Sequence, residues 1–250
     1  MTVKKYEPKI EVLPNSEILA QRCVEIFISD ANKAIGTKQS FQAALSGGNS
    51  PKRFYELLGI QPQAKALKWS KIHLFWVDER YVPAVSPQSN YKLASDSFLK
   101  KVPIPQENIH RIATEYPDIN TAARKYEVTL KTVFKLEKGQ KPEFDLIILG
   151  MGTDGHTGSL FPNSTVSFDT DNLACVVYGI DDKLKRITLT APVLRQAKHL
   201  LVLVQGTEKA SILKKVITSE PDEIRYPIQV LWPVLNKVTW LVDKEAAGLL

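Results

Sequence analysis

Cysteine is scarce in this 250-residue chain. Only Cys23 and Cys175 occur, and they form no C-x-x-C motif. Two isolated cysteines in apolar surroundings are typical of reduced core thiols, which excludes a disulfide framework and favours a cytoplasmic protein. The sequence also has no H-E-x-x-H motif among its four histidines. We therefore expect no bound metal.

Long hydrophobic runs are missing as well. The longest purely apolar stretches, such as Leu200–Val204, span only a few residues and are too short to cross a bilayer. The first eight residues contain no apolar segment of the kind found in a signal peptide. These two absences predict a protein without a membrane partner.

Acidic residues are outnumbered, since 33 Lys and Arg stand against 27 Asp and Glu and give a net charge of +6. The basic residues are scattered, and the tightest groups are pairs such as Lys4–Lys5 and Lys100–Lys101. Aromatic residues do not alternate with them, as they would on a surface that binds single strands. We expect no nucleic-acid partner, and the positive charge favours an anionic small substrate.

What the sequence does contain is an alternation of short apolar runs and amphipathic stretches. Strands are predicted at Lys9–Val12, Phe41–Leu45, Ile72–Val77, Phe144–Leu149, Ala174–Tyr178, Arg186–Leu189, Leu200–Val204 and Val238–Val242. Helices are predicted from Ser16 towards Lys33 and over Pro51–Leu58, Asn90–Leu99, Ile119–Leu136, Pro192–Ala197 and Thr207–Val216, the last capped by Thr207.

Continuous apolar strands separated by helices are typical of a parallel sheet covered on both faces. We therefore predict an α/β fold with three αβα layers around a mostly parallel, open, Rossmann-like sheet. Ala174–Tyr178 and Arg186–Leu189 are expected to pair with each other, and Pro83–Ile104 is expected to leave the sheet as an excursion. No stretch has the composition of a flexible linker, so residues 1–250 are predicted to form one domain.

Polar clusters follow four of the predicted strands. They are Ser46–Pro51, Asp78–Tyr81, Gly150–Gly158 and Gln205–Lys209. In an open parallel sheet the carboxyl ends of the strands meet at one edge, where ligands bind. The four clusters are therefore predicted to converge on a single site.

The Gly150–Gly158 loop holds the strongest candidate for chemistry. Four glycines in nine residues allow a backbone that leaves space for a ligand, and Asp154 and His156 flank one of them, Gly155. A carboxylate beside an imidazole fixes its tautomer and raises its basicity. The alternative is a turn aspartate next to a surface histidine, but the position at the end of a buried strand favours an acid/base role for His156.

The Ser46–Pro51 cluster resembles a phosphate cradle. Gly47 and Gly48 let the backbone approach a ligand closely, and the amino end of the following helix attracts an anion. The cluster is neither a Walker A loop nor a G-x-G-x-x-G fingerprint. A simple strand-to-helix turn explains the same residues equally well.

Three cations lie in or near these clusters. Arg80 can bind a phosphate or carboxylate through its planar fork, although an ordinary surface ion pair is the other interpretation. Lys209 falls in the first turn of a predicted helix, where it would help to hold an anion. Arg186 precedes its predicted strand, so the strand-end rule does not place it. No G-x-S-x-G nucleophile motif accompanies them.

Six segments carry a family resemblance in their order and spacing, and together they cover nearly the whole chain. The segments are Ala44–Gly48, Trp76–Arg80, Ser89–Tyr91, Gly150–Pro162, Arg186–Thr190 and Gly206–Ala210. They resemble the 6-phosphogluconolactonase family, within the glucosamine/galactosamine-6-phosphate isomerase superfamily. The resemblance implies hydrolysis of 6-phospho-D-glucono-1,5-lactone to 6-phospho-D-gluconate in the oxidative pentose phosphate pathway, which supplies NADPH. No cofactor is implied, and we expect a monomer.

The resemblance also implies roles for individual residues. His156 would activate a water molecule as general base, with Asp154 orienting its ring. Arg80 or loop amides would stabilise the oxyanion that develops on the carbonyl. The residues implied to contact the substrate or its phosphate are Ser46, Gly47, Gly48, Asp78, Asn90, Gly155, Arg186 and Lys209.

Two other functions are compatible with parts of the pattern. Glucosamine-6-phosphate deaminases resemble the chain around Asp78 and in G-x-D-G-H, but that family carries a Glu five residues after its histidine, where this chain has Phe161. A non-catalytic sugar-phosphate-binding protein is the second alternative. The intact pair of Asp154 and His156 argues against it.

Overall fold

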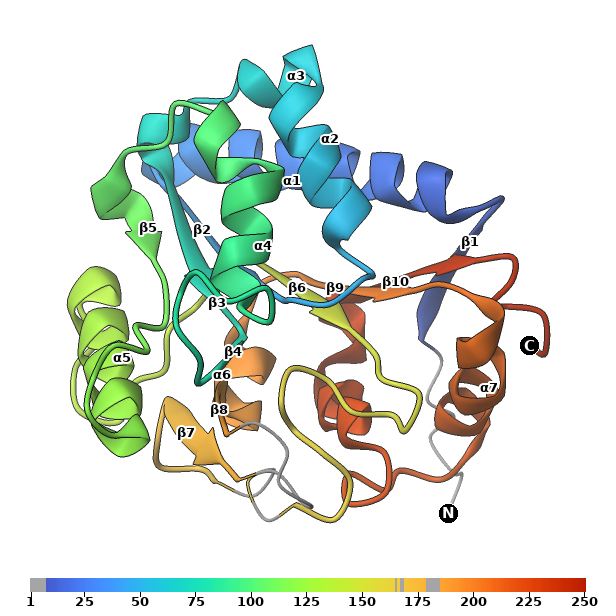
Figure 1. The fold of residues 1–250 in the computed structure, drawn as a ribbon. Helices are drawn as coiled ribbons and strands as arrows, with labels where there is room; N and C mark the ends of the chain where they lie inside the picture. The colour runs from blue at the N-terminus through green and yellow to red at the C-terminus, as the bar shows by residue number, and fades with distance from the viewer. Residues whose placement is uncertain (1–7, 165, 167–168, 179–184) are drawn as a thin grey trace.

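A seven-stranded sheet forms the centre of the computed structural model, which describes residues 8–164, 166, 169–178 and 185–250 (Figure 1). Its strand order is β1-β10-β9-β6-β2-β3-β5, and every neighbouring pair is parallel. The strands are β1 (Lys9–Leu13), β2 (Phe41–Leu45), β3 (Ile72–Trp76), β5 (Ile109–His110), β6 (Leu146–Gly150), β9 (Leu200–Val204) and β10 (Val238–Asp243). The predicted mostly parallel sheet is confirmed.

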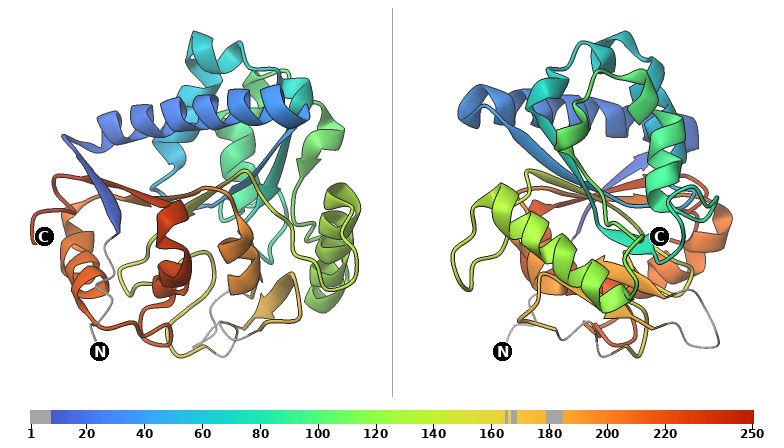
Figure 2. Two further views of the ribbon diagram at one scale, coloured as in Figure 1. Left: turned by 180° about the vertical axis from the view of Figure 1, so that it is seen from behind. Right: turned by 60° about the vertical axis from the view of Figure 1, so that its left-hand side comes forward.

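Helices cover both faces of this sheet (Figures 1 and 2). One face carries α1 (Ser16–Lys38), α2 (Lys52–Ile60), α3 (Pro62–Lys65) and α4 (Asn90–Ser97). The other carries α5 (Ile119–Phe134), α6 (Ala191–Gln196) and α7 (Ala210–Thr218). The three-layer αβα arrangement predicted from the sequence is thus confirmed. Among the described helices, none combines the length and apolar character needed to cross a membrane.

The first helix shows how local chemistry sets the ends of an element. The Asn15 side chain accepts a hydrogen bond from the Ile18 amide at 3.0 Å and so caps α1. The helix runs to Lys38, five residues beyond its predicted end, because Ala34 and Ile35 continue the buried face. It stops where Gln39 adopts the left-handed conformation, with φ 64°.

A second, three-stranded sheet lies beside the helices and has the order β4-β8-β7. It contains β4 (Asp78–Arg80), β7 (Ala174–Val177) and β8 (Arg186–Leu189), all antiparallel. The predicted pairing of β7 with β8 is confirmed. The strand β4 was not predicted, because three charged residues in a row have no strand pattern. Its pairing places Arg80 directly opposite Arg186.

Three further details differ from the prediction. The stretch Thr207–Lys209 is a 3₁₀ turn, the α-helix begins only at Ala210, and Thr207 does not cap it. The short edge strand β5 was not predicted. The segment Pro227–Lys237 forms a 3₁₀ helix, labelled η6, for which no element was predicted. The excursion Pro83–Ile104 does leave the sheet, and it carries α4.

The order of the strands reverses between β2 and β6. From β2 the chain continues outwards to β3 and β5, whereas from β6 it continues in the opposite direction to β9 and β10. The loops after β2 and β6 therefore leave their neighbouring strands in opposite directions. Such a switch point opens a crevice at the carboxyl ends of the strands.

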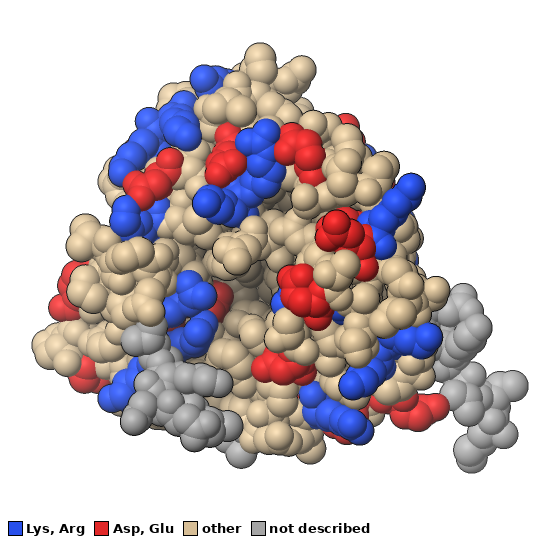
Figure 3. Space-filling view, turned by 45° about the vertical axis from the view of Figure 1, so that its right-hand side comes forward, with Lys and Arg blue, Asp and Glu red and all other residues tan. Residues whose placement is uncertain are grey.

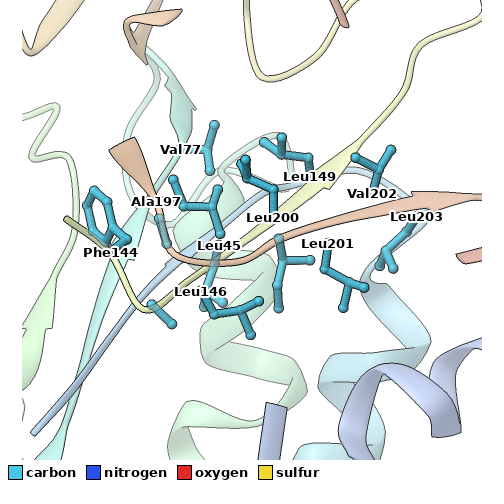
Figure 4. Packing of buried hydrophobic residues seen from close by; sticks show 14 of the residues in the cluster. Leu45, Val77, Phe144, Leu146, Leu149, Ala197, Leu200, Leu201, Val202 and Leu203 are labelled. Carbon is cyan, nitrogen blue, oxygen red and sulfur yellow. The ribbon is translucent and has the colours of Figure 1, made fainter. Parts of the chain in front are cut away.

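The strands that meet at this point are buried on both faces. Figure 4 shows buried side chains from β2, β6 and β9, among them Leu45, Leu149 and Leu201, and those of Leu149 and Leu201 point to opposite sides of the sheet. All three are 0% exposed. A core packed on both sides of the sheet gives the strand ends fixed positions, which a site built from four loops requires.

One titratable pair lies on the outer strands of this sheet. His73 of β3 and His110 of β5 stack with an interplanar angle of 5°, and their Nδ1 and Nε2 atoms are 3.1 Å apart. Burial, helped by the nearby His73, lowers the pKa of His110 to about 4. Burial and the charge of Lys38 also lower the pKa of His73. Both rings are therefore neutral in the folded protein at pH 7.

This pair predicts a specific acid sensitivity. The unfolded chain takes up a proton on His110 near pH 6.5, whereas the folded chain does so only near pH 4. The stability contributed by the neutral ring is therefore complete above pH 6.5 and is lost as the pH falls towards 4. We expect His110→Phe to lose less stability than the wild type over this range in urea denaturation. Equal losses in the two proteins would contradict the prediction.

Candidate active site

A pocket of about 300 Å³ lies at the switch point and is lined by the loops after four strands. The polar clusters that follow β2, β3, β6 and β9 all contribute to its wall. The predicted site residues that line it are Ser46, Gly47, Gly48, Asp78, Arg80, Asn90, His156, Arg186 and Lys209. Asp154 and Gly155 are not among the lining residues, although both are close neighbours of His156 in the same loop.

His156 is held by Asp154 two residues before it. The Asp154 Oδ1 atom is 2.5 Å from the His156 Nδ1 atom and also accepts a hydrogen bond from the His156 amide at 3.1 Å. Burial tends to raise the pKa of Asp154, but the hydrogen bond and charge of His156 outweigh it and hold that pKa at about 2. The carboxylate is therefore ionised at neutral pH. It holds the proton of the imidazole on Nδ1 and leaves Nε2 as the basic atom.

Two glycines of the loop have distinct reasons to be glycine. A Cβ atom on Gly152 would lie 2.0 Å from His156 Nδ1, so only glycine leaves space for the imidazole. Gly155 has φ +85°, and its carbonyl accepts a hydrogen bond from the Ile228 amide at 3.0 Å. Gly155 thus fixes the loop to η6, and Gly152 provides the floor beneath the His156 ring.

Asp78 lies beneath the pocket with 4% of its surface exposed. Its carboxylate accepts hydrogen bonds from Ser159 Oγ at 2.7 Å and from Asn90 Nδ2 at 3.3 Å, and Arg186 Nη1 is 3.8 Å away. The Asp78 carboxylate therefore connects three elements: the loop that carries His156, helix α4 and strand β8. Ser159 was not among the predicted site residues, although it lies in the same loop as His156.

Arg80 is fixed on one side of its guanidinium. Its Nη1 atom donates to the Gln88 carbonyl at 2.9 Å and to Asn90 Oδ1 at 2.6 Å. Its Nε atom is buried and has no partner among the described residues. Arg80 and Arg186 both line the pocket, from paired positions on the adjacent strands β4 and β8. Burial lowers the pKa of Arg186, and the charge of Arg80 adds to this effect.

The loop after β2 is tied to its surroundings by its first two residues. The Ser46 hydroxyl donates to the Ile148 carbonyl at 2.8 Å, so it bridges β2 and β6 rather than pointing a free donor at the ligand. A Cβ atom on Gly47 would lie 1.7 Å from Asn90 Oδ1. Gly47 is therefore needed to admit the Asn90 side chain, a reason that the sequence did not reveal.

Lys209 lines the pocket from the loop after β9. Burial lowers its pKa, while the charges of Glu208 and Asp154 act in the opposite direction. The turn that carries it is anchored by Asp243, whose two carboxylate oxygens each lie 3.1 Å from the Gly206 amide nitrogen. Glu208 was not among the predicted site residues, and it is the second carboxylate that lines the pocket, beside Asp78.

Glu79 is the most completely bonded residue that the sequence did not assign to the site. Its carboxylate is 2% exposed and accepts hydrogen bonds from the amides of Arg80, Asn90 and Tyr91 and from Ser89 Oγ. Burial raises the pKa of Glu79, and these four donors oppose the rise. The carboxylate satisfies the first amides of α4 and so fixes Asn90 beside Arg80.

Metal ligands are not grouped in this site. Within the residues that the structure describes, no three His, Cys, Asp or Glu side chains come close enough together to hold an ion. The pocket instead offers one imidazole, which is paired with the Asp154 carboxylate, together with three cations, two carboxylates and a buried hydrogen-bond network. This set of groups suits proton transfer to or from a bound anion.

Known proteins resemble this chain in both sequence and fold. The family model described as glucosamine-6-phosphate isomerases/6-phosphogluconolactonase matches residues 14–240. A 6-phosphogluconolactonase of Synechocystis sp. is 40% identical over 239 residues, which is 96% of this chain and 97% of the relative.

Two solved structures with different activities resemble this fold. A 6-phosphogluconolactonase from Thermotoga maritima aligns with a TM-score of 0.80 and 30% identity over 95% of this chain and 100% of its own. A monomeric glucosamine-6-phosphate deaminase aligns with a TM-score of 0.83 but only 22% identity, over 97% of this chain and 100% of its own. The second comparison shows a shared fold alone, so fold does not separate the two chemistries.

The Glu79 arrangement predicts a large effect on stability. Glu79→Ala leaves four donors without their acceptor in a buried position, and we expect it to lower the free energy of unfolding by about 3 kcal/mol. The exposed Glu107 provides the control, since Glu107→Ala is expected to change stability by no more than about 0.5 kcal/mol. Urea denaturation measures both. Equal stability of the two variants would show that Glu79 does not hold α4.

Proposed function

The chain belongs to the glucosamine-6-phosphate isomerase/6-phosphogluconolactonase family, and from that premise we propose that it hydrolyses 6-phospho-D-glucono-1,5-lactone with His156 as general base. The product is 6-phospho-D-gluconate, and the reaction belongs to the oxidative branch of the pentose phosphate pathway. The observation that carries the proposal is the pair of Asp154 and His156 at a pocket that Arg80, Arg186 and Lys209 also line.

The reaction needs one proton to move twice. A lactone is a cyclic ester, so water attacks its carbonyl carbon while His156 Nε2 takes a proton from that water. The ring oxygen then leaves as the tetrahedral intermediate collapses, and the imidazolium returns the proton to it. Asp154 stabilises the imidazolium and keeps its orientation through both steps, as in other carboxylate–histidine pairs.

The cations are proposed to bind different negative groups of the reacting substrate. Arg80 is proposed to stabilise the oxyanion, because Asn90 and Gln88 hold one edge of its guanidinium and leave the other edge to the pocket. Arg186 and Lys209 are proposed to bind the phosphate together with the Gly47–Gly48 backbone. This division leaves each anionic group with its own donors.

The loop residue at position 161 argues against the alternative chemistry. The deaminases that the sequence resembles carry a carboxylate at this position for opening the sugar ring, whereas Phe161 here has no titratable group and packs 4.8 Å from the His156 ring. This chain therefore lacks the acid that an amino-sugar-phosphate isomerase needs at this position. A purely sugar-phosphate-binding protein would not need the Asp154–His156 pair.

The proposal further includes that the protein acts as a monomer in the cytoplasm. Its partner is a small phosphorylated sugar lactone, and neither nucleic acid nor a membrane is a partner. Figure 3 shows one face on which basic and acidic side chains are interspersed. A surface that follows a phosphate backbone would gather its cations into one stripe. The charge distribution on this face thus favours a small anion held inside a pocket.

The central test is acid release from freshly generated lactone. Wild-type protein is expected to exceed the spontaneous rate, and His156→Ala to lose about 100-fold or more in kcat because the base is missing. Asp154→Asn should lose less, since the base remains but its tautomer is no longer fixed. A pH-stat or coupled dehydrogenase assay measures all three proteins.

His199 provides a matched control for that test. It forms the same kind of contact, with its Nδ1 atom 2.6 Å from Asp30 Oδ2, but it lies at the opposite end of β9 from the pocket. His199→Ala is therefore expected to keep its kcat. An unimpaired His156→Ala would remove His156 from the mechanism, and ammonia release from glucosamine 6-phosphate would favour the isomerase.

The roles of the cations predict different substrate dependences. Lys209→Met and Arg186→Met are expected to lower kcat/KM for the phosphorylated lactone by about 10-fold to 100-fold and to leave unphosphorylated glucono-1,5-lactone nearly unaffected. Arg80→Met should lower kcat for both substrates, because the oxyanion forms in each. Lys214, an exposed lysine on α7, gives the control Lys214→Met. Equal losses on both substrates for Lys209→Met would overturn its assignment to the phosphate.

A further inference from the structure

Phe161 contacts two groups of the proposed site, the general base His156 and the phosphate-binding cation Arg186. Its ring centroid is 4.8 Å from that of His156, with 52° between the ring planes. On another side, the Arg186 guanidinium carbon lies 5.3 Å from the same centroid. One half-buried phenyl ring therefore contacts both the base and a cation of the pocket.

His156 needs such a contact because its other restraints act at one edge. Asp154 binds only the Nδ1 atom, and a hydrogen bond at one atom leaves the imidazole free to tilt about that atom. A Cβ atom on Gly152 would meet the Nδ1 and Cε1 atoms, so Gly152 also lies against the part of the ring near Nδ1. The packed face of Phe161 restricts this tilt, so that Nε2 points to one place in the pocket.

Arg186 needs the contact for a different reason. Among the described residues, its nearest carboxylate oxygen belongs to Asp78 and is 3.8 Å away, which is long for a hydrogen bond, and that carboxylate already accepts from Ser159 and Asn90. The face of an aromatic ring attracts a guanidinium group and leaves the N–H donors of that group free. Phe161 thus steadies the guanidinium while leaving its donors to a ligand.

We propose that Phe161 is a positioning residue that sets the orientation of His156 and of Arg186 together. The proposal rests on the function proposed above. A ring at this position serves both purposes, because one part of it packs on the imidazole and its π face holds the guanidinium. A carboxylate at the same position would form ion pairs with both groups, and an aliphatic side chain would fill the volume without attracting the cation.

The test replaces the ring with an aliphatic side chain of similar size. Phe161→Leu is expected to lower kcat about tenfold through the loss of His156 orientation and to raise KM about threefold to tenfold through the loss of Arg186 orientation. Phe134 on α5, another half-buried phenylalanine with two aromatic neighbours, gives the control Phe134→Leu, which should leave both constants unchanged. Circular dichroism and urea denaturation verify that each variant is folded.

A double-mutant cycle separates positioning from a general loss of structure. In the Arg186→Met background, Phe161→Leu should no longer raise KM, although it should still lower kcat. The same effect on KM in both backgrounds would overturn the link to Arg186. Unchanged kcat and KM in the single variant would overturn the proposal as a whole.

Two readouts do not depend on lactonase activity. The His156 ring protons should show an upfield ring-current shift in the NMR spectrum that Phe161→Leu abolishes, and the signal is assigned by its loss in His156→Ala among the four histidines. Inorganic phosphate, followed by calorimetry, should bind Phe161→Leu about threefold to tenfold more weakly than wild type. If wild-type protein hydrolyses no lactone but both effects are seen, the proposed function fails and the role of Phe161 stands. An active wild type without either effect refutes the role alone.

Discussion

The divergence of the chain between β2 and β6 is the constraint on which the site depends. The two strands are neighbours, yet the segments that follow them run to opposite sides of the sheet, so their loops cannot pack over each other. The Ser46 hydroxyl binds the Ile148 carbonyl at 2.8 Å and ties the two strand ends together beneath the opening. The crevice is thus a product of topology, and its floor is held by a hydrogen bond between the strands that define it.

Buried carboxylates organise the cations around this crevice. Asp78 and Glu79 are adjacent in β4 and both nearly inaccessible, at 4% and 2% exposed. Because neighbouring side chains of a strand point to opposite faces, one carboxylate binds Ser159 of the loop that carries His156, while the other binds the amino end of α4. Arg80 and Arg186 are consequently positioned before any ligand arrives. A preorganised set of donors lowers the cost of stabilising charge during a reaction.

The sequence was sufficient to predict the parallel sheet, its layers and the edge at which polar loops meet. These features follow from local patterns, namely apolar runs of strand length and glycine-rich turns after them. It was not sufficient for β4, because Asp78–Arg80 is a strand only by virtue of its pairing with β8, more than a hundred residues later. The need for glycine at position 47 was hidden for the same reason, since it depends on the side chain of Asn90. Contacts between segments distant in sequence, rather than propensity, decide such positions.

A fold shared with a glucosamine-6-phosphate deaminase raises the question of what separates the two chemistries. The frame of strands and helices superposes at a TM-score of 0.83, so the difference must reside in side chains around the pocket. Opening an amino-sugar ring requires an acid near the base, whereas hydrolysing a lactone requires the base to face water and an oxyanion site. Phe161 excludes an acid from the surface of the His156 ring and at the same time contacts Arg186. In the proposed mechanism, one apolar side chain at that point removes a proton donor and restricts the base, both of which favour ester hydrolysis over isomerisation.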